Sequence, residues 1–509
     1  MGIGGSNADS ESDDARSQLT LDSTAGRWTM AAAVLGTSMV FLDGTVVNIA
    51  LPAIGDEFGA SITGLQWIVN GYLLTLASLV LLGGALGDRY GRARIFQIGV
   101  IGFTLASVLC ALATSTELLI AGRILQGVGG ALLTPGSLAI IEASFVKIDR
   151  ARAIGVWSGL AGASMAVGPP LGGYLVEAVG WRSVFFINVP IGIAVALIAW
   201  RKVPESRDTS LTGSVDFPGA VLAVVTLAAA SYALIEGPDL GPTSPTVIAS
   251  LLASFTAAAV FLLVERRTRE PMLPLKLFSN QTFSAANLVT FLVYAAFGGA
   301  LFLLVVLLQT GMGYSPILAG AATLPVTIMM LLFSSRAGAL AQRVGARTPL
   351  TVGSVVIALS LALMSRLGID SDYLTDVLPT VTVLAIGLTI VVAPVTATTL
   401  GAVPDENAGV ASAVSNAVSR TGQLFAIALL PAVGGLSGEQ YDDPTAIASA
   451  FETAALFAAG VCLLGAVVAW TLIDRDALKV GEPELVQPAD CGLAGAPLVG
   501  AEAVRSADG

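Results

Sequence analysis

The amino-acid sequence predicts an all-α polytopic membrane protein with fourteen transmembrane helices, and two features of the sequence support this. Only 12% of its 509 residues are charged and 55% are hydrophobic, whereas soluble domains carry about 25% charged residues. Apolar runs of about 20 residues recur along the chain, and one such run is long enough to cross the hydrocarbon core of a bilayer. Several soluble domains, which the length alone would suggest, do not fit this composition.

Each apolar run that is long enough to span the membrane, with some tilt, predicts one helix. Glycine and proline interrupt the runs near 152–200 and 407–434, so the helices there are less sharply separated from their neighbours. In chain order, the expected helices are 29–54, 65–86, 95–113, 117–141, 152–176, 181–200, 215–235, 246–264, 283–308, 316–341, 348–365, 376–400, 407–434 and 449–473.

The charges of the connecting loops predict the orientation of these helices. When both termini are placed in the cytoplasm, the inner loops hold most of the lysines and arginines and the outer loops hold only Arg182 and Arg366. This is the distribution that the positive-inside rule describes. Removing one helix would exchange the sides of all later loops and destroy the asymmetry. We therefore expect an even number of helices in the cytoplasmic (inner) membrane, with both termini on the cytoplasmic side.

Composition and charge exclude several classes of function. The net charge of −11 comes mostly from the polar ends, and we expect 1–27 and 475–509 to be disordered cytoplasmic tails. The chain has no histidine and its three cysteines are far apart, so no metal site is expected. It has no nucleotide-binding loop, no nucleophile–base pair and no basic patch. We expect no enzyme, no cofactor and no nucleic-acid partner.

An internal repeat divides the chain into two halves. The segment Gly84–Gly91 reads GALGDRYG, and Gly338–Gly345 reads GALAQRVG after the second helix of the later half. We expect a six-helix half at 28–200, an inserted helix pair at 201–270 and a second six-helix half at 271–474. Repeats of this kind are the architecture of alternating-access transporters, with the substrate site between them at the bilayer midplane.

The loop after the second helix carries the most specific motif, with glycines that permit a tight turn and an acid that can pair with an arginine or a helix N-terminus. Ordinary positive-inside charge would require neither the acid nor the glycines. The loop resembles that of the major facilitator superfamily, and the resemblance implies a conformational latch between the halves on the cytoplasmic side. The expected latch residues are Gly84, Asp88, Arg89, Gly91 and Arg92.

The first helix contains a carboxylate in its middle, at Asp43 within FLDGTVVNIALP. A charge at that depth is costly and marks a functional site by default. The string resembles the first-helix motif of the fourteen-helix drug:proton antiporter family within the superfamily, which implies that Asp43 couples transport to protons. A structural aspartate that caps a neighbouring helix or pairs with an arginine is the alternative.

The fourth helix places Arg123 and Gln126 on one face with Gly127 and Gly130, because these positions follow helical spacing. A buried arginine needs a partner, and Asp43 is the obvious one. The segment resembles the proton-transfer motif of the superfamily, so Arg123 is the expected second member of the coupling pair. The alternative is an arginine that extends to the membrane interface.

The fifth helix contains a glycine–proline cluster at Gly168, Pro169, Gly172 and Gly173. Proline kinks a helix and glycine permits close contact with a neighbour. The cluster resembles the antiporter motif of the superfamily, which implies export rather than uptake, although both residues are common in all membrane helices. The following WRSVFFINVP also resembles the fourteen-helix family, and an interfacial tryptophan explains it without a role in transport.

Polar residues inside other helices are candidates for lining a substrate cavity. Arg420 lies near Asn416 and Gln423 on roughly one helix face, where it lines the cavity, binds the opposite latch or makes a structural hydrogen bond. The more common role of such residues is bonding between helices. The candidates are Asn70, Gln126, Asn287, Gln309, Asn416 and Arg420.

Together these motifs predict a proton-coupled antiporter that exports hydrophobic or cationic small molecules by alternating access, works as a monomer and has membrane lipid around it. One alternative is a dedicated exporter or importer of a single metabolite, lipid or siderophore. Another is a membrane scaffold or regulator that does not transport, although the presence of Asp43, Asp88 and Arg123 argues against it.

Overall fold

The computed structural model describes residues 19–208, 215–404, 407–436 and 443–478. Apart from one isolated backbone bridge between Leu19 and Phe145, the regular structure in this part of the chain is helical. The first eight long segments are α2 (Thr24–Phe58), α3 (Ile62–Tyr90), α4 (Arg92–Ala111), α5 (Thr116–Ser144), α6 (Lys147–Ala178), α7–α8 (Ser183–Phe186 and Asn188–Lys202), α9 (Phe217–Leu240) and α10 (Pro245–Arg267).

Six further segments complete the bundle, after a short 3₁₀ turn, η1 (Leu275–Ser279). They are α11 (Gln281–Val306) with the π-helical turn η2 (Leu307–Gly311), α12–α13 (Pro316–Ala322 and Leu324–Val344), α14 (Arg347–Met364), η3–α15 (Tyr373–Val377 and Leu378–Gly401), α16 (Ala408–Val433) and α17 (Pro444–Leu472). The prediction of fourteen spanning segments is therefore confirmed.

Hydropathy identifies most of these segments as membrane spans. Twelve have the length and composition of a span, and the remaining two are α6 and α16. These two belong to the regions where the sequence pattern was least sharply divided, because glycine, serine and proline interrupt their apolar runs. The chain is a multi-pass membrane protein.

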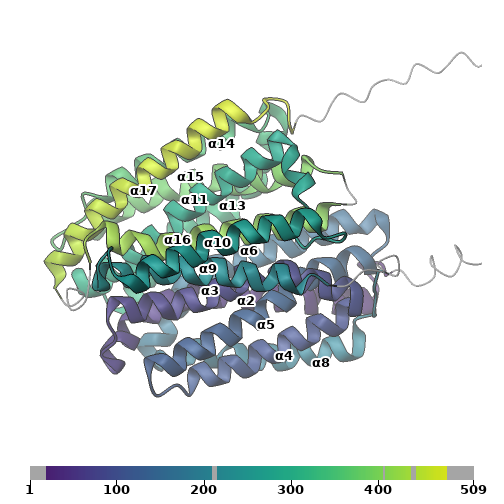
Figure 1. Ribbon diagram of the computed structural model, residues 1–509, viewed down its shortest axis with the longest axis horizontal. Coiled ribbons are helices and arrows are strands. Elements are labelled where there is room, and N and C mark those ends of the chain that lie inside the picture. Colours follow the sequence, from purple (N-terminus) through teal and green to yellow (C-terminus); the bar gives the residue numbers. More distant parts are fainter. Residues whose placement is uncertain (1–18, 209–214, 405–406, 437–442, 479–509) are drawn as a thin grey trace, which may run out of the picture.

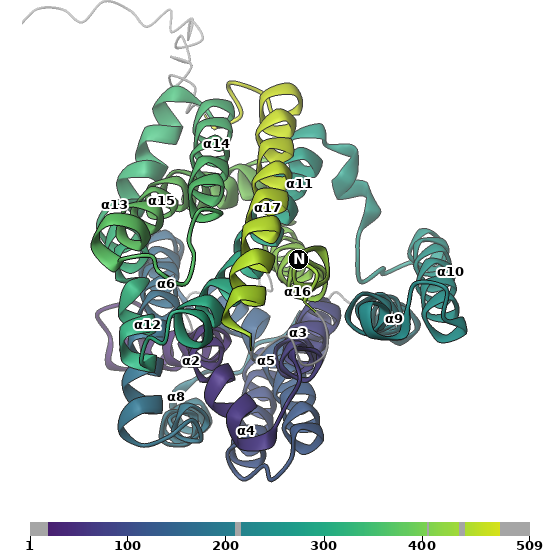
Figure 2. The same ribbon diagram turned by 90° about the vertical axis from the view of Figure 1, so that its left-hand side faces the viewer.

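The helices form two bundles with a pair at the side (Figures 1 and 2). In the first bundle, α5 packs against α3 and α4, and α2 packs against α6 and α8. In the second, α11 packs against α16 and α17, and α14 packs against α15 and α17. The pair α9–α10 lies beside both bundles, and α9 contacts α3 and α16 (Figure 2). The bundles meet along α3–α16, α6–α12 and α6–α13.

The helices extend beyond the apolar runs that predicted them. The first has 35 residues, from Thr24 to Phe58, where about 20 suffice to span a bilayer. Ser23 caps its start by accepting a hydrogen bond from the backbone N–H of Gly26. The polar residues at such ends continue the helix past the apolar stretch, which hydropathy does not detect.

The expected disorder of 1–27 is wrong for its last residues. The backbone N–H of Leu19 donates to the carbonyl of Ser144 at 2.7 Å, and the carbonyl of Leu19 accepts from Val146 at 3.1 Å. Leu21 N–H donates to the Asp149 carboxylate at 3.0 Å. At the other end, Ala477 and Leu478 pack against the core. Residues 1–18 and 479–509, to which most of the two tail predictions refer, lie outside the described part of the chain.

Candidate transport site

The two ends of the helix bundle can be told apart by their turns, and they are called the Asp88 end and the Trp181 end. The Asp88 end holds the turn between α3 and α4, and the Trp181 end holds the turn between α6 and α7. Because successive helices run in opposite directions, α2 and α16 both run from the Asp88 end toward the Trp181 end.

A buried charged cluster lies around Asp43, in the middle of α2. Asp43 has no exposed surface, and Arg123 of α5 is 1% exposed. The Arg123 Nη1 donates to Asp43 Oδ2, as the sequence predicted for this pair. A buried ion pair is stable only when its remaining hydrogen-bonding groups are also satisfied.

Neutral side chains from three other positions satisfy the Asp43 carboxylate and its partner. Gln126 Nε2 donates to Asp43 Oδ1 at 2.7 Å, and Asn188 Nδ2 of α8 donates to the same oxygen at 2.9 Å. Gln126 Nε2 also donates to Ser107 Oγ of α4 at 2.9 Å, while its Oε1 accepts from Arg123. Gln126 is therefore part of the charged cluster, and its place among the cavity-lining residues stays a prediction.

The guanidinium of Arg123 is held in place by α3. Its Nε donates to the carbonyl of Ile68 at 3.2 Å, and its central carbon lies 4.2 Å from the centre of the Tyr72 ring. Tyr72 in turn donates from its hydroxyl to the Val40 carbonyl. Five helices of the first bundle thus fix the positions of one carboxylate and one guanidinium. The arrangement places one buried carboxylate beside a buried cation that balances its charge.

Sequence reasoning missed Asn188. It belongs to WRSVFFINVP, whose only expected role was an interfacial tryptophan. Even that role differs, because Trp181 is 4% exposed and donates to Glu57 at 2.7 Å, beside an Arg182–Glu57 ion pair at 2.7 Å. Trp181 and Arg182 both bind the Glu57 carboxylate, and these contacts hold the start of α7 against the end of α2.

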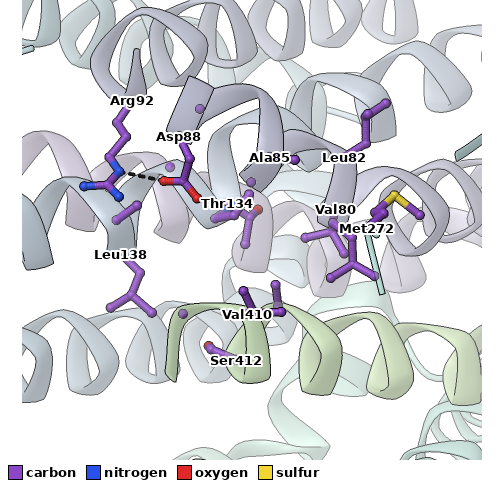
Figure 3. A pocket seen from close by; sticks show the side chains of 18 of the residues that line it. Val80, Leu82, Ala85, Asp88, Arg92, Thr134, Leu138, Met272, Val410 and Ser412 are labelled. Carbon is purple, nitrogen blue, oxygen red and sulfur yellow. Dashed lines mark hydrogen bonds and ion pairs between the residues drawn. The ribbon is translucent and has the colours of Figure 1, made fainter. Parts of the chain in front are cut away.

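The loop at the Asp88 end is held by the first bundle and by the chain that leaves it. Asp88, in the last turn of α3, accepts at its Oδ1 from the Nε of Arg92, the first residue of α4, at 2.8 Å (Figure 3). Arg89 forms an ion pair with Glu270 at 3.8 Å. Glu270 precedes the second bundle, so this contact reaches the segment that follows the inserted pair.

Gly91 requires its residue type for two reasons. Its φ is 111°, a region that side chains rarely adopt. In addition, a Cβ there would lie 2.7–2.9 Å from the Glu205 carboxylate. Glu205 caps α4 by accepting from the backbone N–H groups of Ala93 and Arg94, both at 3.0 Å. The segment after α8 therefore closes over the loop and satisfies the start of α4.

A cavity of about 400 Å³ lies at the Asp88 end, between α3, α5, α16 and the segments that flank the inserted pair. Its wall includes Asp88 and Arg92 on one side and Val410 and Ser412 of α16 on the other (Figure 3). Phe41 and Asn416 also line it. The cavity therefore has walls from both bundles.

The glycine–proline cluster of α6 holds the bundles together toward the Trp181 end. Side chains added at Gly168 and Gly172 would meet Thr45 and Val46 of α2, and one at Gly173 would meet the backbone of Pro316 and Ile317. In return, a side chain at Gly320 would meet the backbone of Pro169. These glycines permit backbone contact between α6 and its neighbours.

The other half of α6 has no such contacts. Side chains added at Gly155, Gly159 and Gly162 would meet nothing within 4 Å. Leu331, Leu332 and Leu340 on α13, which runs toward the same end, are exposed. The glycines of α6 are therefore packed against neighbouring helices toward the Trp181 end and uncovered toward the Asp88 end.

The remaining predicted cavity residues have different surroundings. Asn416 lines the cavity, whereas Gln309 donates to the Ile49 carbonyl at 3.0 Å and links the two bundles near the Trp181 end. Asn287 donates within its own helix to Phe283. Asn70 has no exposed surface, and neither atom of its amide has a hydrogen-bond partner among the described residues. Arg420 lies over the Phe41 ring, 5.2 Å from its centre.

The structure also contains a buried acid pair that the sequence did not suggest. Asp216 and Glu265, at the Asp88 end of α9–α10, are 6% and 3% exposed. Asp216 caps α9 through the Gly219 N–H at 2.8 Å, and Glu265 accepts from the Leu273 N–H at 3.0 Å. The predicted helix stopped at 264, just before Glu265, so the acid was assigned to a loop.

Residues 33–427 match the Major Facilitator Superfamily. The chain is 37% identical over 423 residues to the methylenomycin A resistance protein of Bacillus subtilis, covering 82% of this chain and 90% of that protein. It is 36% identical over 408 residues to the multidrug resistance protein Stp of Mycobacterium tuberculosis, covering 80% and 75%. The fold also resembles the crystal structure of the D-xylose–proton symporter, with a TM-score of 0.63, 14% identity and coverage of 89% and 99%.

The chain belongs to the major facilitator superfamily.

Membership confirms the family that the sequence motifs predicted, and it confirms a transporter rather than an enzyme. In this superfamily member, the two bundles α2–α8 and α11–α17 are the halves of the fold. The pair α9–α10 between them is the insertion that the sequence spacing predicted.

Proposed function

We propose that the protein exports hydrophobic small molecules of the drug type in exchange for protons, by alternating access. Its relatives in Bacillus subtilis and Mycobacterium tuberculosis are named for resistance to methylenomycin A and to multiple drugs. The Asp43 cluster supports the proton-coupled part of the proposal, because it is the buried carboxylate around which five helices of the first half converge.

The mechanism follows from where the charge lies. Asp43 is held by Arg123, Gln126 and Asn188 when it is ionised. A proton on Asp43 removes its attraction to Arg123 and leaves the guanidinium without a counter-charge, which changes how α2 and α5 pack. Protonation therefore biases the equilibrium between two arrangements of the halves, which is what coupling requires.

The packing of α6 supports export from the Asp88 end. We assign this end to the cytoplasm, with both termini on that side, because its loops carry most of the basic residues. The cavity there admits molecules from the cytoplasm and the inner leaflet, while the glycine contacts near Gly173 close the outer side. The latch role of the Asp88 loop belongs to the opposite arrangement, in which the inner side closes.

The deciding experiment compares the wild type with Asp43→Asn in energised cells loaded with a fluorescent lipophilic dye. The asparagine keeps the shape of the side chain but cannot exchange a proton, so we expect efflux driven by the proton gradient to be lost. Efflux in the variant equal to that of the wild type would refute the coupling role. A well-expressed wild type that moves none of several chemically different dyes would favour a transporter dedicated to one substrate.

A further inference from the structure

Arg420 is a buried cation for which the described structure provides no counter-charge. It lies in α16 of the second half and is 9% exposed. Among the residues that the structure describes, its contact with Phe41 is a stacking contact, and no hydrogen bond or ion pair to it is found. A buried charge without a partner is costly, and in membrane proteins such a charge marks a ligand path.

The nearest carboxylate along the facing helix is already occupied. Arg420 approaches α2 at Phe41 and at Gly44, where an added side chain would lie 3.8 Å from its Nη1. Asp43 lies between these two positions, but its oxygens accept from Arg123, Gln126 and Asn188. The same added side chain at Gly44 would also lie 3.8 Å from the Tyr72 ring, and the central carbon of the Arg123 guanidinium lies 4.2 Å from the centre of that ring. The centre of the protein therefore holds two guanidinium groups and one carboxylate.

Two residues of the cavity wall lie near Arg420. Asn416 and Phe41 line the cavity wall. Arg420 follows Asn416 by one helical turn on the same face, and its guanidinium lies over the Phe41 ring, 5.2 Å from its centre. Arg420 is not itself part of the cavity wall, so we expect a molecule in the cavity to meet the Phe41 ring first and to reach the guanidinium by displacing that ring.

Asn70 provides a second polar group near this position. Gln66 of α3 donates to the carbonyls of Ile427 and Ala428 at 2.7 and 3.1 Å, which fixes the register between α3 and the antiparallel α16. Asn70 lies one turn after Gln66 on α3. In the antiparallel α16, the position beside Asn70 is therefore about one turn from Arg420. Both polar atoms of the Asn70 amide lack partners although the side chain is fully buried. An unpartnered buried amide calls for a hydrogen-bonding ligand.

We propose that Arg420 binds the anionic group of the substrate, so that the transported class is hydrophobic acids, with a carboxylate or an ionised phenol attached to an apolar body. This inference rests on the proposed export function and makes it more specific. A guanidinium presents a planar fork that matches a carboxylate. The anion restores the charge balance that the two arginines and one aspartate lack, and Asn70 is placed to contact a neutral oxygen of the same molecule.

The test uses the purified full-length chain and three probes that share one apolar body: pyrenebutyric acid, its methyl ester and the corresponding primary amine. Dissociation constants are measured by fluorescence anisotropy for the wild type, Arg420→Gln and Arg420→Lys. We expect the wild type to bind the acid most tightly and Arg420→Gln to weaken acid binding at least about tenfold. Arg420→Lys keeps the charge without the fork, so it should retain part of the preference.

The matched control is Arg336→Gln. Arg336 also lies over a phenylalanine ring, 5.4 Å from the centre of Phe333, but it is an exposed residue of α13. Its loss should leave the binding of all three probes unchanged. For Arg420→Gln, binding of the uncharged ester should stay within about twofold of the wild type, since this probe lacks the anion. Binding of the amine, which is a cation, should be unchanged or tighter, because its repulsion by the Arg420 guanidinium is removed.

Two outcomes would overturn the assignment. One is a wild type that binds the acid no more tightly than the ester. The other is an Arg420→Gln variant with an unchanged unfolding temperature whose affinity for all three probes falls equally, which would make Arg420 a structural residue. Measuring transport of the three probes in vesicles tests the export proposal separately from the Arg420 assignment. Proton-driven export of the ester and amine without preference for the acid would leave export standing and remove the Arg420 assignment.

Discussion

At the scale of single residues, the amino-acid sequence was enough to predict the ion pair of the charged cluster but not its neutral hydrogen-bond donor. Asp43 and Arg123 could be paired from sequence, because each is an intramembrane charge that requires a partner. Asn188 could not be found in this way. An asparagine inside a membrane helix forms bonds with many kinds of neighbour, and its direction toward Asp43 depends on how α8 packs against α2 and α4.

Asn188 gives the first prediction at this scale. Asn188→Ala removes one of the donors to the buried carboxylate, and a hydrogen bond to a charged group contributes about 1.5–3 kcal/mol. We expect a lower thermal unfolding temperature in detergent and slower efflux. Asn287→Ala is the comparison, because Asn287 donates within its own helix to Phe283, and it should change the unfolding temperature less. Equal effects of the two substitutions would contradict the role given to Asn188.

At the scale of helices, α6 combines two functions in one continuous element. Its Gly168–Gly173 portion packs closely on α2 and α12, while the portion around Gly155–Gly162 has open space beside its glycines. The sequence revealed the glycines but not this division, because glycine permits close packing without ensuring it. Whether a glycine is in contact depends on the arrangement of the halves.

Two glycines of α6 test this division. Gly173→Ala places a methyl group against the backbone of Pro316 and Ile317, and overpacking of this kind costs about 1–3 kcal/mol. We expect a lower unfolding temperature and a smaller population of the arrangement closed at the Trp181 end. Gly162→Ala should be neutral or slightly stabilising, because alanine favours helix by up to about 1 kcal/mol over glycine. Thermal unfolding in detergent measures both, and a loss in Gly162→Ala as large as in Gly173→Ala would contradict the described packing.

The repeat also has a structural counterpart at the scale of elements. Gly91 directly follows α3 and Gly345 directly follows α13, both with positive φ, 111° and 84°. Each glycine is covered by the chain that follows the last helix of its half, with Glu205 over Gly91 and Arg475 over Gly345. The sequence showed the two loops as copies. It did not show their covering segments, because Glu205 and Arg475 lie far along the chain and in dissimilar contexts.

At the scale of the whole molecule, the orientation in the membrane can be measured directly. Ser412 lines the cavity at the Asp88 end, and Asp370 is exposed in the turn between α14 and α15 at the other end. Cys110 and Cys462 are buried and should not react, and Cys491 is replaced by serine. With an impermeant maleimide, we expect Ser412→Cys to react in inverted vesicles and Asp370→Cys on intact cells. The reverse pattern would refute the proposed orientation.

Sequence reasoning succeeded best at this largest scale. Fourteen spans, two related halves and an inserted pair follow from apolar length and from a repeated loop, which are properties of the chain itself. The place of the inserted pair does not follow, because the α9 run is apolar nearly all round and gives no sign of which helices it contacts. Two hydrogen bonds hold α9 against α3. Trp67 donates to Glu236 and Thr63 donates to Asp239, both at 2.8 Å.

These bonds have a consequence for molecules dissolved in the bilayer. Because α9 is hydrogen-bonded to α3 and also contacts α16, it covers the seam where α3 of the first half meets α16 of the second (Figure 2). The opposite seam, between α6 and α13, has no such cover in the described part of the chain. If the halves alternate as proposed, we therefore expect lipid-soluble molecules to enter from this one side of the protein. We also expect α9–α10 to move together with the six helices of the first half, to which hydrogen bonds hold α9.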